Sequence, residues 1–586
     1  MVKNMKKEWV GIGVLIIVLT IALSTMVCKG SSLSVEEQVA ADNLPVLDIL
    51  LRVIRDTDGP ISHIEVDLEM SVAERTPETP FTLMAPVKYT VISGIADRIE
   101  DLQVTDDEGI IELNQLEDES DYGGMVIWRK WQAARPVTGP VKVHYRARVP
   151  EPIPRPPGPP YHLSLNGGGV SGAGCGFMAL PEEKGEFTLR LRWDLDAFEP
   201  GSTGISSLGD GDIETTGPLD RLFQSWYIAG PLGRYPEQRK TEGFSAAWLG
   251  NPPFDAQEVM AWSDKAFNAL KSFFRDTSPA SYRFFMRVGP ADQGGGGTAL
   301  YNSFMLYVPE EPELARNPRN TIFHEMTHKW VGGMEGSPAK VFWFSEGLTV
   351  HYTRFVMYRA GLCTAEEFLK DVNGTVISFL TNPLRNMANK DIGEKFWQDR
   401  NAQRLPYQRG SLYFAYVDGK LRAVSRGKQT LDHVVLSLFK RRANGEKLTK
   451  DLWLAELEKE IGPSASADFE SIIIRGEDFI PASDAFGPEF ERVPAELRVF
   501  ELGFDERKTL YAEEKRITGL VEGSAAARAG LQEGDLILND VNPRALRDNE
   551  GLTLKLEVQR GDETLKIEYL PRGESVNGYK YVLKEK

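Results

Sequence analysis

The spacing of apolar residues changes several times along the chain. Between residues 47 and 250, apolar and polar residues alternate, most clearly at 63–70, 141–146 and 187–193. A strand with this alternation buries one face and exposes the other to water, which is typical of antiparallel sheets. The pattern therefore predicts a β-sandwich-like domain over residues 47–250.

The next region shows the longer period of helices. Residues 255–275 carry apolar side chains three or four positions apart. Further along, a capping box at 364–367 and amphipathic segments at 431–442 and 448–461 also indicate helices. We predict a second domain over residues 251–495, with strands early and helices late. The fold class expected for the whole chain is multidomain α+β.

An uncharged apolar run occupies residues 9–27, shortly after three lysines, Lys3, Lys6 and Lys7. Its length matches the ~20 residues of a membrane-spanning helix, and basic residues before it favour an amino terminus on the inner side. We predict an N-terminal cytoplasmic stub (1–8), a transmembrane signal-anchor (9–28) and a linker (29–46).

A cleaved signal peptide is the alternative for this run, because Ala22-Leu23-Ser24 offers small residues at a cleavage spacing. An uncleaved anchor would make the chain a single-pass protein of the cell membrane, with the membrane as a partner. Cleavage would make it secreted or periplasmic. In both cases the bulk of the chain is expected outside the cytoplasm.

Composition narrows the function classes. The 586 residues are 41% hydrophobic and 26% charged, enough for roughly three or four globular cores. The formal net charge of −17 argues against nucleic acid as a partner. The three cysteines are too few for a fold built on disulfides. Cys175 and Cys363 are most simply buried thiols, although a bridge between them stays open.

The clearest candidate chemistry lies in His324-Glu325-Met326-Thr327-His328. Asn317-Pro318 just upstream predicts a helix through residues 321–331, because Asn is a good N-cap and Pro fits the first helical position. On a helix, positions i and i+4 lie on one face, so both imidazoles can bind one zinc ion. Glu325 would then lie beside a water molecule as general base.

A third zinc ligand is available downstream. Ser345 is expected to cap a second helix, with Glu346 in its first turn. The aromatic run at 342–344 would restrict water and hold the orientation of the carboxylate. The predicted cofactor is one Zn²⁺ per chain.

Two motifs together resemble a known group of enzymes. His-Glu-x-x-His-x-Trp followed by Trp-Phe-x-Glu-Gly-x-Thr is similar to the gluzincin metallopeptidases, the clan of thermolysin and the aminopeptidase N superfamily. The glycyl aminopeptidase family matches best, with its β-rich N-terminal domain, thermolysin-like catalytic domain and C-terminal PDZ domain. The resemblance implies His324, His328 and Glu346 as zinc ligands and Glu325 as base.

The resemblance extends to residues 405–410, Leu-Pro-Tyr-Gln-Arg-Gly, which are similar to a Pro-Tyr-Glu-Lys-Gly stretch of the superfamily. There the tyrosine hydroxyl stabilises the oxyanion of the tetrahedral intermediate, so Tyr407 inherits that role. Considered without the resemblance, Tyr407 would be a packed aromatic residue.

The segment before the zinc-binding helix is expected to bind substrate. In thermolysin-like proteases an edge strand at this place pairs with the extended peptide, and the corresponding residues here are Gly296, Gly297, Thr298 and Ala299. Relatives carry a glutamate in this motif that holds the free amino group of the substrate. Because this chain has no acidic residue between Asp292 and Glu310, endopeptidase action and exopeptidase action with a relocated acid both stay open.

The last segment, residues 496–586, closely resembles PDZ domains of bacterial proteases, through stretches such as Leu502-Gly503-Phe504 and 524–538. Backbone amides around Gly503 would receive the terminal carboxylate of a peptide that adds as a strand. A PDZ domain that packs on the protease and binds nothing is the alternative.

The sequence therefore predicts a zinc-dependent peptidase of aminopeptidase-type ancestry that acts on peptide or protein substrates. A metallo-endopeptidase that lacks the amine-anchoring glutamate is one alternative. The other is a membrane-tethered PDZ adaptor with a silent protease domain.

Overall fold

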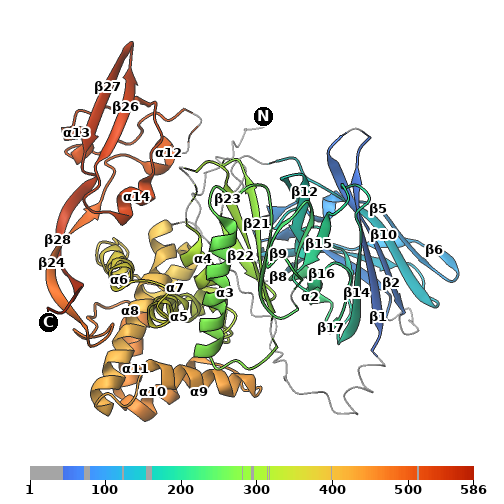
Figure 1. Cartoon of the computed structure of the whole chain (residues 1–586), viewed down its shortest axis with the longest axis horizontal. Coiled ribbons are helices and arrows are strands. Elements are labelled where there is room, and N and C mark those ends of the chain that lie inside the picture. Colours follow the sequence, from blue (N-terminus) through green and yellow to red (C-terminus); the bar gives the residue numbers. More distant parts are fainter. Residues whose placement is uncertain are drawn as a thin grey trace. The chain divides into compact units, whose positions relative to one another are not determined.

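The computed structural model describes residues 44–585, apart from 58, 72–78, 91, 122–123, 153–160, 240, 280, 292–295, 313–314, 316, 397–398, 511 and 513. Contacts between residues divide this part of the chain into two compact units (Figure 1). The first unit ends at Lys329 and the second begins at Trp330. Each unit is described by itself.

Three sheets form the large β domain predicted for the first unit. The strands of the first sheet are, in spatial order, β17 (Ile213–Gly217), β14 (Phe187–Asp194), β1 (Val46–Arg55), β2 (Ile61–Ser71), β10 (Pro140–Arg148), β5 (Ile99–Asp106) and β6 (Gly109–Ile111). The second sheet has the order β13 (Leu180–Pro181), β3 (Thr82–Tyr89), β9 (Val126–Ala133) and β7 (Leu113–Gln115), with β4 (Ile92–Ser93) paired to β3 and β8 (Glu119–Asp121) paired to β9. The third sheet has the order β11 (Ser164–Asn166), β12 (Gly169–Ala173), β18 (Trp226–Gly230), β15 (Thr203–Ser206) and β16 (Gly209–Asp210). The predicted alternation is present in β1, where Leu47, Ile49 and Leu51 are all 0% exposed.

A fourth sheet carries the elements around the His324–His328 motif. Its order is β19 (Gly233–Tyr235), β20 (Gly243–Leu249), β21 (Ser281–Gly289), β23 (Ser303–Pro309) and β22 (Gly297–Leu300). The first two strands precede the domain boundary predicted at residue 250, so in this sheet the chain continues across that boundary. Helices α3 (Ala256–Phe273) and α4 (Arg319–Thr327) complete this part of the unit.

Helices dominate the first part of the second unit, as predicted. They are α5 (Pro338–Arg359), α6 (Ala365–Leu380), α7 (Asn389–Lys395), α8 (Arg400–Ser425), α9 (Leu431–Ala443), α10 (Lys450–Ile461) and α11 (Ser464–Phe469). The predicted capping box is present, because the Thr364 hydroxyl and the Glu367 carboxylate each accept the other residue's amide. A core of aromatic and aliphatic side chains, including Phe342, Phe368 and Phe486, joins these helices.

A long two-stranded ribbon of β24 (Phe490–Phe500) and β28 (Arg572–Leu583) leads to the C-terminal segment (Figure 1). The segment itself contains α12 (Glu506–Leu510), α13 (Ala525–Arg528), β25 (Leu536–Ile537), α14 (Pro543–Asp548), β26 (Leu554–Arg560) and β27 (Glu563–Tyr569). Asn373 of α6 exchanges two hydrogen bonds of 2.8 Å with the backbone of Tyr581 in β28. The ribbon is thereby attached to the helical core.

Two expectations about the chain change here. None of the helices in the described ranges is long and apolar enough to cross a membrane, and the expected anchor, residues 9–28, lies outside them. This finding counts against the predicted single-pass membrane location, which we withdraw. Cys175 and Cys363 are both free thiols, so the bridge left open by the sequence does not form.

Candidate metal centre

Helix α4 brings His324 and His328 to the site and begins at Arg319, with Pro318 as its N-cap residue where the sequence predicted Asn317. The Asn317 side chain accepts a hydrogen bond from the amide of Arg319 at 3.1 Å. The helix ends earlier than predicted, at Thr327, with His328 as its C-cap residue. Helix is also excluded at Gly332, just beyond the predicted end at residue 331, because Gly332 has a φ of 138°.

Packing fixes the direction in which α4 presents its side chains. The ring of Phe323 lies 6.2 Å from that of Trp262 in α3, and Phe323 is fully buried. Arg319 at the start of α4 pairs with Glu258 of α3 at 2.6 Å. Glu325 is 0% exposed and His328 is 8% exposed. The motif therefore faces inward and not toward bulk solvent.

The ligand atoms of three residues converge. One nitrogen from each of His324 and His328 and one carboxylate oxygen from Glu346 lie within 4.8 Å of one another. The two histidine Nε2 atoms are 3.2 Å apart, and the rings are nearly perpendicular at 83°. Two ligands of a tetrahedral zinc at about 2.1 Å lie roughly 3.4 Å apart. The donor set and its spacing therefore fit one zinc ion.

Glu346 reaches the site from a different part of its helix than predicted. α5 begins at Pro338 after the N-cap residue Ser337, so Ser345 is not a cap and Glu346 lies about two turns inside the helix. The Thr349 hydroxyl donates to the Ser345 carbonyl at 2.6 Å. Glu346 is 1% exposed, so its carboxylate is held in a buried position.

The aromatic residues before Glu346 belong to the helical core. Trp343 stacks on Phe414 with ring centroids 5.9 Å apart, and Phe344 meets Trp453 edge to face at 5.7 Å. Both are buried, at 3% and 0% exposure. They pack the segment of α5 that carries Glu346 into the core, while the restriction of water at the carboxylate stays a prediction.

Tyr407 lies on α8, partly buried beside the core that contains Phe342. α8 crosses α5 closely at Gly347 and Gly410, since a Cβ on Gly347 would lie 2.6 Å from the Cα of Gly410. The helix that carries Tyr407 is thus in direct contact with the residue next to Glu346.

The expected substrate strand is an edge strand. β22 covers Gly297–Leu300, pairs with β23 and ends the order of its sheet. Gly296 precedes it and its carbonyl accepts the amide of Tyr307 at 2.8 Å. Thr298 is 0% exposed and Ala299 is partly exposed. These positions agree with the place predicted for substrate pairing, while substrate contact itself stays a prediction.

Sequence reasoning missed a contact that joins this strand to α4. The turn between β22 and β23 contains Asn302, whose φ of 45° is left-handed. Its side-chain oxygen accepts a hydrogen bond from the Lys329 ammonium at 2.7 Å. Lys329 directly follows His328. Asn302 and Lys329 lie too far apart in the sequence for their contact to be recognised without the fold.

Two buried tyrosines from elsewhere in the first unit also lie near the motif. The Tyr161 hydroxyl shares a hydrogen bond of 3.3 Å with the Thr298 hydroxyl. Burial raises the pKa of Tyr161 and of Tyr282, and the nearby Glu325 carboxylate raises both further. Their proximity to Glu325 is not visible in the sequence, because a tyrosine in a β-rich region is most simply a core residue.

The C-terminal carboxylate loop predicted at Leu502-Gly503-Phe504 is part of a core. Leu502 and Phe504 are 4% and 6% exposed, and the Leu502 carbonyl accepts the hydroxyl of Tyr569 at 2.7 Å. The Gly503 carbonyl accepts the amide of Val521 at 2.8 Å. Helix α12 begins at Glu506, three residues after Gly503, whereas strand addition needs an extended edge, so carboxylate binding at this loop stays a prediction.

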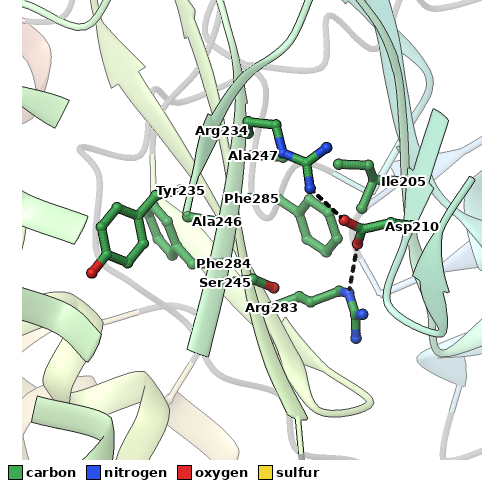
Figure 2. Close-up of a pocket in the computed structure, with 10 residues that line it drawn as sticks. All are labelled: Ile205, Asp210, Arg234, Tyr235, Ser245, Ala246, Ala247, Arg283, Phe284 and Phe285. Atoms are coloured by element: carbon green, nitrogen blue, oxygen red, sulfur yellow. Dashed lines mark hydrogen bonds and ion pairs between the residues drawn. The ribbon is translucent and has the colours of Figure 1, made fainter. Parts of the chain in front are cut away.

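A second charged cluster in the first unit lies around Asp210 (Figure 2). Its carboxylate pairs with Arg234 at 2.7 Å and with Arg283 at 3.5 Å. The adjoining cavity measures about 10 Å³, which leaves room for one water molecule at most. Burial lowers the pKa of Arg283, and Asp210 opposes that effect. The cluster joins the sheet of β16 to that of β21 and is no ligand pocket.

Comparisons with known proteins agree with this geometry. A family model described as M61 glycyl aminopeptidase matches residues 318–415, which include all three candidate ligands and Tyr407. No curated protein matches the chain.

Solved structures extend the likeness to the fold. An aminopeptidase N family protein from Idiomarina loihiensis has 17% identity and a TM-score of 0.66, covering 92% of this chain and 98% of its own. The M1 zinc metallopeptidase from Deinococcus radiodurans has 16% identity and a TM-score of 0.46, covering 75% of this chain and 96% of its own. Native yeast LTA4 hydrolase has 15% identity and a TM-score of 0.46, with 75% and 68% covered. The family match and the fold of the Idiomarina protein together support a gluzincin-type peptidase.

Proposed function

We propose that this chain is a zinc-dependent peptidase that hydrolyses peptide bonds with an activated water molecule. The observation that carries the proposal is the convergence of His324, His328 and Glu346 ligand atoms within 4.8 Å. The M61 match over the same residues supports it. We assign one zinc ion per chain to these residues.

The catalytic roles follow from the positions of the side chains. Zinc, when bound, supplies Lewis-acid polarisation and lowers the pKa of water. Glu325 lies between the two histidine ligands on α4 and is fully buried. We assign it as the base that takes a proton from the attacking water and delivers it to the leaving amine. The Tyr407 hydroxyl is assigned to donate a hydrogen bond to the oxyanion.

Substrate is proposed to lie along β22. An extended peptide would add to the outer edge of this strand and continue its antiparallel pattern over Gly296 to Ala299. The hydrogen bond between Lys329 and Asn302 supports this assignment, because it holds the turn of the strand next to the end of α4. Main-chain pairing of this kind accepts many side chains, so the substrate class is peptides in general.

Aminopeptidase action is our first assignment and endopeptidase action the second. The first is favoured by the matching family model, which describes a glycyl aminopeptidase. The second is favoured by the absence of an acidic residue between positions 292 and 310 of the sequence. An aminopeptidase would need another acid to hold the free amino group.

Product analysis tests the function and separates the two assignments. The purified protein with zinc is incubated with matched peptides that carry free or acetylated amino termini. Loss of single residues from free-amine peptides alone supports aminopeptidase action. Internal cleavage of acetylated peptides supports endopeptidase action. If a zinc-loaded protein cuts neither set, the peptidase proposal is wrong and a silent protease domain takes its place.

For residues 496–586 we propose a PDZ-like module. Its support is the sequence resemblance together with a separate core that includes Leu502, Ile517 and Val558. Peptide binding beside Gly503 stays a prediction. The start of helix α12 at Glu506 counts against the addition of a peptide strand there. A C-terminal peptide library screened against the full protein tests it, and the absence of any carboxylate-dependent binder would support a packing role alone.

A further inference from the structure

The segment that follows the zinc-binding helix accepts hydrogen bonds from a side chain that is distant in the sequence. Arg442, near the end of α9, donates from Nη2 to the carbonyl of Trp330 at 2.8 Å and from Nη1 to the carbonyl of Gly332. Trp330 is two residues after His328. The fork of one guanidinium therefore holds two carbonyls of the same short segment.

The two carbonyls lie just beyond α4, whose C-cap residue is His328. Hydrogen bonds from a charged donor such as a guanidinium are roughly twice as strong as those between neutral groups. Burial lowers the pKa of Arg442 to about 10, so the side chain keeps its charge at neutral pH. Its guanidinium also lies over the ring of Phe439 at 4.8 Å.

The bound segment would be pliable without such a contact. Gly332 and Gly333 have φ values of 138° and 71°, a conformation that side-chain-bearing residues rarely adopt. Glycines of this kind leave the backbone many alternative conformations, and a contact has to exclude these for the segment to adopt one of them. A Cβ on Gly333 would lie 3.0 Å from Nη1 of Arg442, so the guanidinium occupies the space that a side chain would need.

A second connection from the same region supports the first. Met334 and Leu448 form a parallel bridge, and the amide of Glu335 donates to the Leu448 carbonyl at 2.8 Å. Lys447 adds an exposed ion pair with Glu335 at 2.7 Å. The segment 330–335 is thus held at both ends by residues 442–448.

We propose that Arg442 is a positioning residue for the metal centre, which fixes the exit of the zinc-binding helix and thereby the orientation of His328. The inference rests on the proposed zinc function. Outer contacts that orient metal ligands change metal affinity by about 10–100-fold when they are removed. Arg442 touches no ligand itself, so its effect must appear as metal affinity and not as lost chemistry at saturating zinc.

Zinc affinity of the full-length apo protein, measured by competition with a chromophoric chelator, tests the proposal. Arg442→Gln is expected to weaken zinc binding by about tenfold or more, and Arg442→Lys by less, because lysine keeps the charge but loses the fork. Gly333→Ala is a second route, because its Cβ would lie 3.0 Å from Nη1 of Arg442 and would also strain the backbone at a φ of 71°. Excess zinc should restore most of the kcat of all three variants.

Two controls separate positioning from general stability. Lys447→Ala removes only the exposed ion pair on the same segment. Arg572→Lys alters another buried arginine that donates to backbone carbonyls, those of Leu546 at 2.6 Å and Asn549 at 2.9 Å. Both are expected to leave zinc affinity within about twofold of wild type, because neither holds the end of α4.

The outcomes are distinct. If Arg442→Gln folds and binds zinc with wild-type affinity, the inference is overturned. If that variant does not fold, wild-type zinc affinity in both Arg442→Lys and Gly333→Ala overturns it. A wild-type protein that binds zinc but cleaves no peptide contradicts the proposed function and leaves the Arg442 comparison valid. A wild-type protein that binds no zinc overturns both.

Discussion

Gly347 and Gly410 face each other where α5 crosses α8, so closely that a Cβ on Gly347 would lie 2.6 Å from the Cα of Gly410. A Cβ on Gly410 would in turn lie 2.5 Å from the carbonyl oxygen of Trp343. Gly347 follows the candidate ligand Glu346, and Gly410 lies three residues after Tyr407. The crossing thus fixes the helix of a candidate metal ligand against the helix of the proposed oxyanion donor.

Gly347→Ala should therefore damage both stability and activity. The new methyl group forces the helices apart, which is expected to lower the free energy of unfolding by about 1–3 kcal/mol. Displacement by about 1 Å can cost roughly 100-fold in rate. Urea unfolding and kcat measure the two effects.

Gly374→Ala in α6 is the matched control: a Cβ there would meet nothing within 4 Å, so the substitution should stabilise the helix by about 0.5–1 kcal/mol. Equal behaviour of the two variants would contradict the crossing argument.

Tyr407→Phe tests the role of the hydroxyl. Removal of an oxyanion donor is expected to lower kcat by about 100- to 1,000-fold, while zinc affinity and folding stay near wild type. Tyr413→Phe on the same helix is the control, because the Tyr413 hydroxyl accepts the indole N–H of Trp453 at 3.4 Å and not a substrate atom. Steady-state kinetics at saturating zinc would distinguish them. An unchanged kcat in Tyr407→Phe would make this residue a packed aromatic.

Tyr161→Phe should act on substrate binding. It removes the hydrogen bond to Thr298 in β22, worth about 0.5–1.5 kcal/mol, so KM is expected to rise about two- to tenfold with little change in kcat. Tyr227→Phe removes a comparable buried hydroxyl, which donates to the Leu222 carbonyl at 3.2 Å, and should leave KM unchanged. A KM that moves equally in both variants would argue against a special role of the Thr298 contact.

Acid should destabilise the first unit in part through His162. Burial lowers its pKa to about 3, and Arg287 and Arg98 contribute in the same direction. In the unfolded chain the pKa of this histidine is about 6.5. Between that pH and about 3, the unfolded state therefore binds a proton that the folded state does not bind. This contribution to stability is present above pH 6.5 and is lost as the pH falls toward 3. Denaturant unfolding across this range should show a shallower pH dependence in His162→Gln, and an identical slope would rule out the contribution.

The zinc motif could be predicted because its signals are local. Asn317 and the spacing of His324 and His328 are enough to place two ligands on one helix face. The Glu346 carboxylate lies with the two histidines, but its helix begins earlier than predicted, because Pro338 after Ser337 starts α5 before Ser345. Local capping preference favoured Ser345, although Ser337 followed by Pro338 is an equally good local start signal.

Other parts of the site depend on contacts distant in sequence. The hydrogen bonds from Lys329 to Asn302 and from Arg442 to the Trp330 carbonyl join residues that lie 27 and 112 positions apart in the sequence. No spacing rule marks them. At the C-terminus, α12 begins at Glu506, three residues after Gly503, and the PDZ resemblance did not indicate this helix.

The most direct test of the account compares Glu325→Gln with the wild-type protein for two quantities, bound zinc and peptide turnover. Glutamine keeps the size of the side chain but cannot accept the proton of the attacking water. The account predicts one zinc per chain in both proteins and turnover in the wild type alone. Retained turnover in Glu325→Gln, or a wild-type protein that is active without zinc, would contradict it.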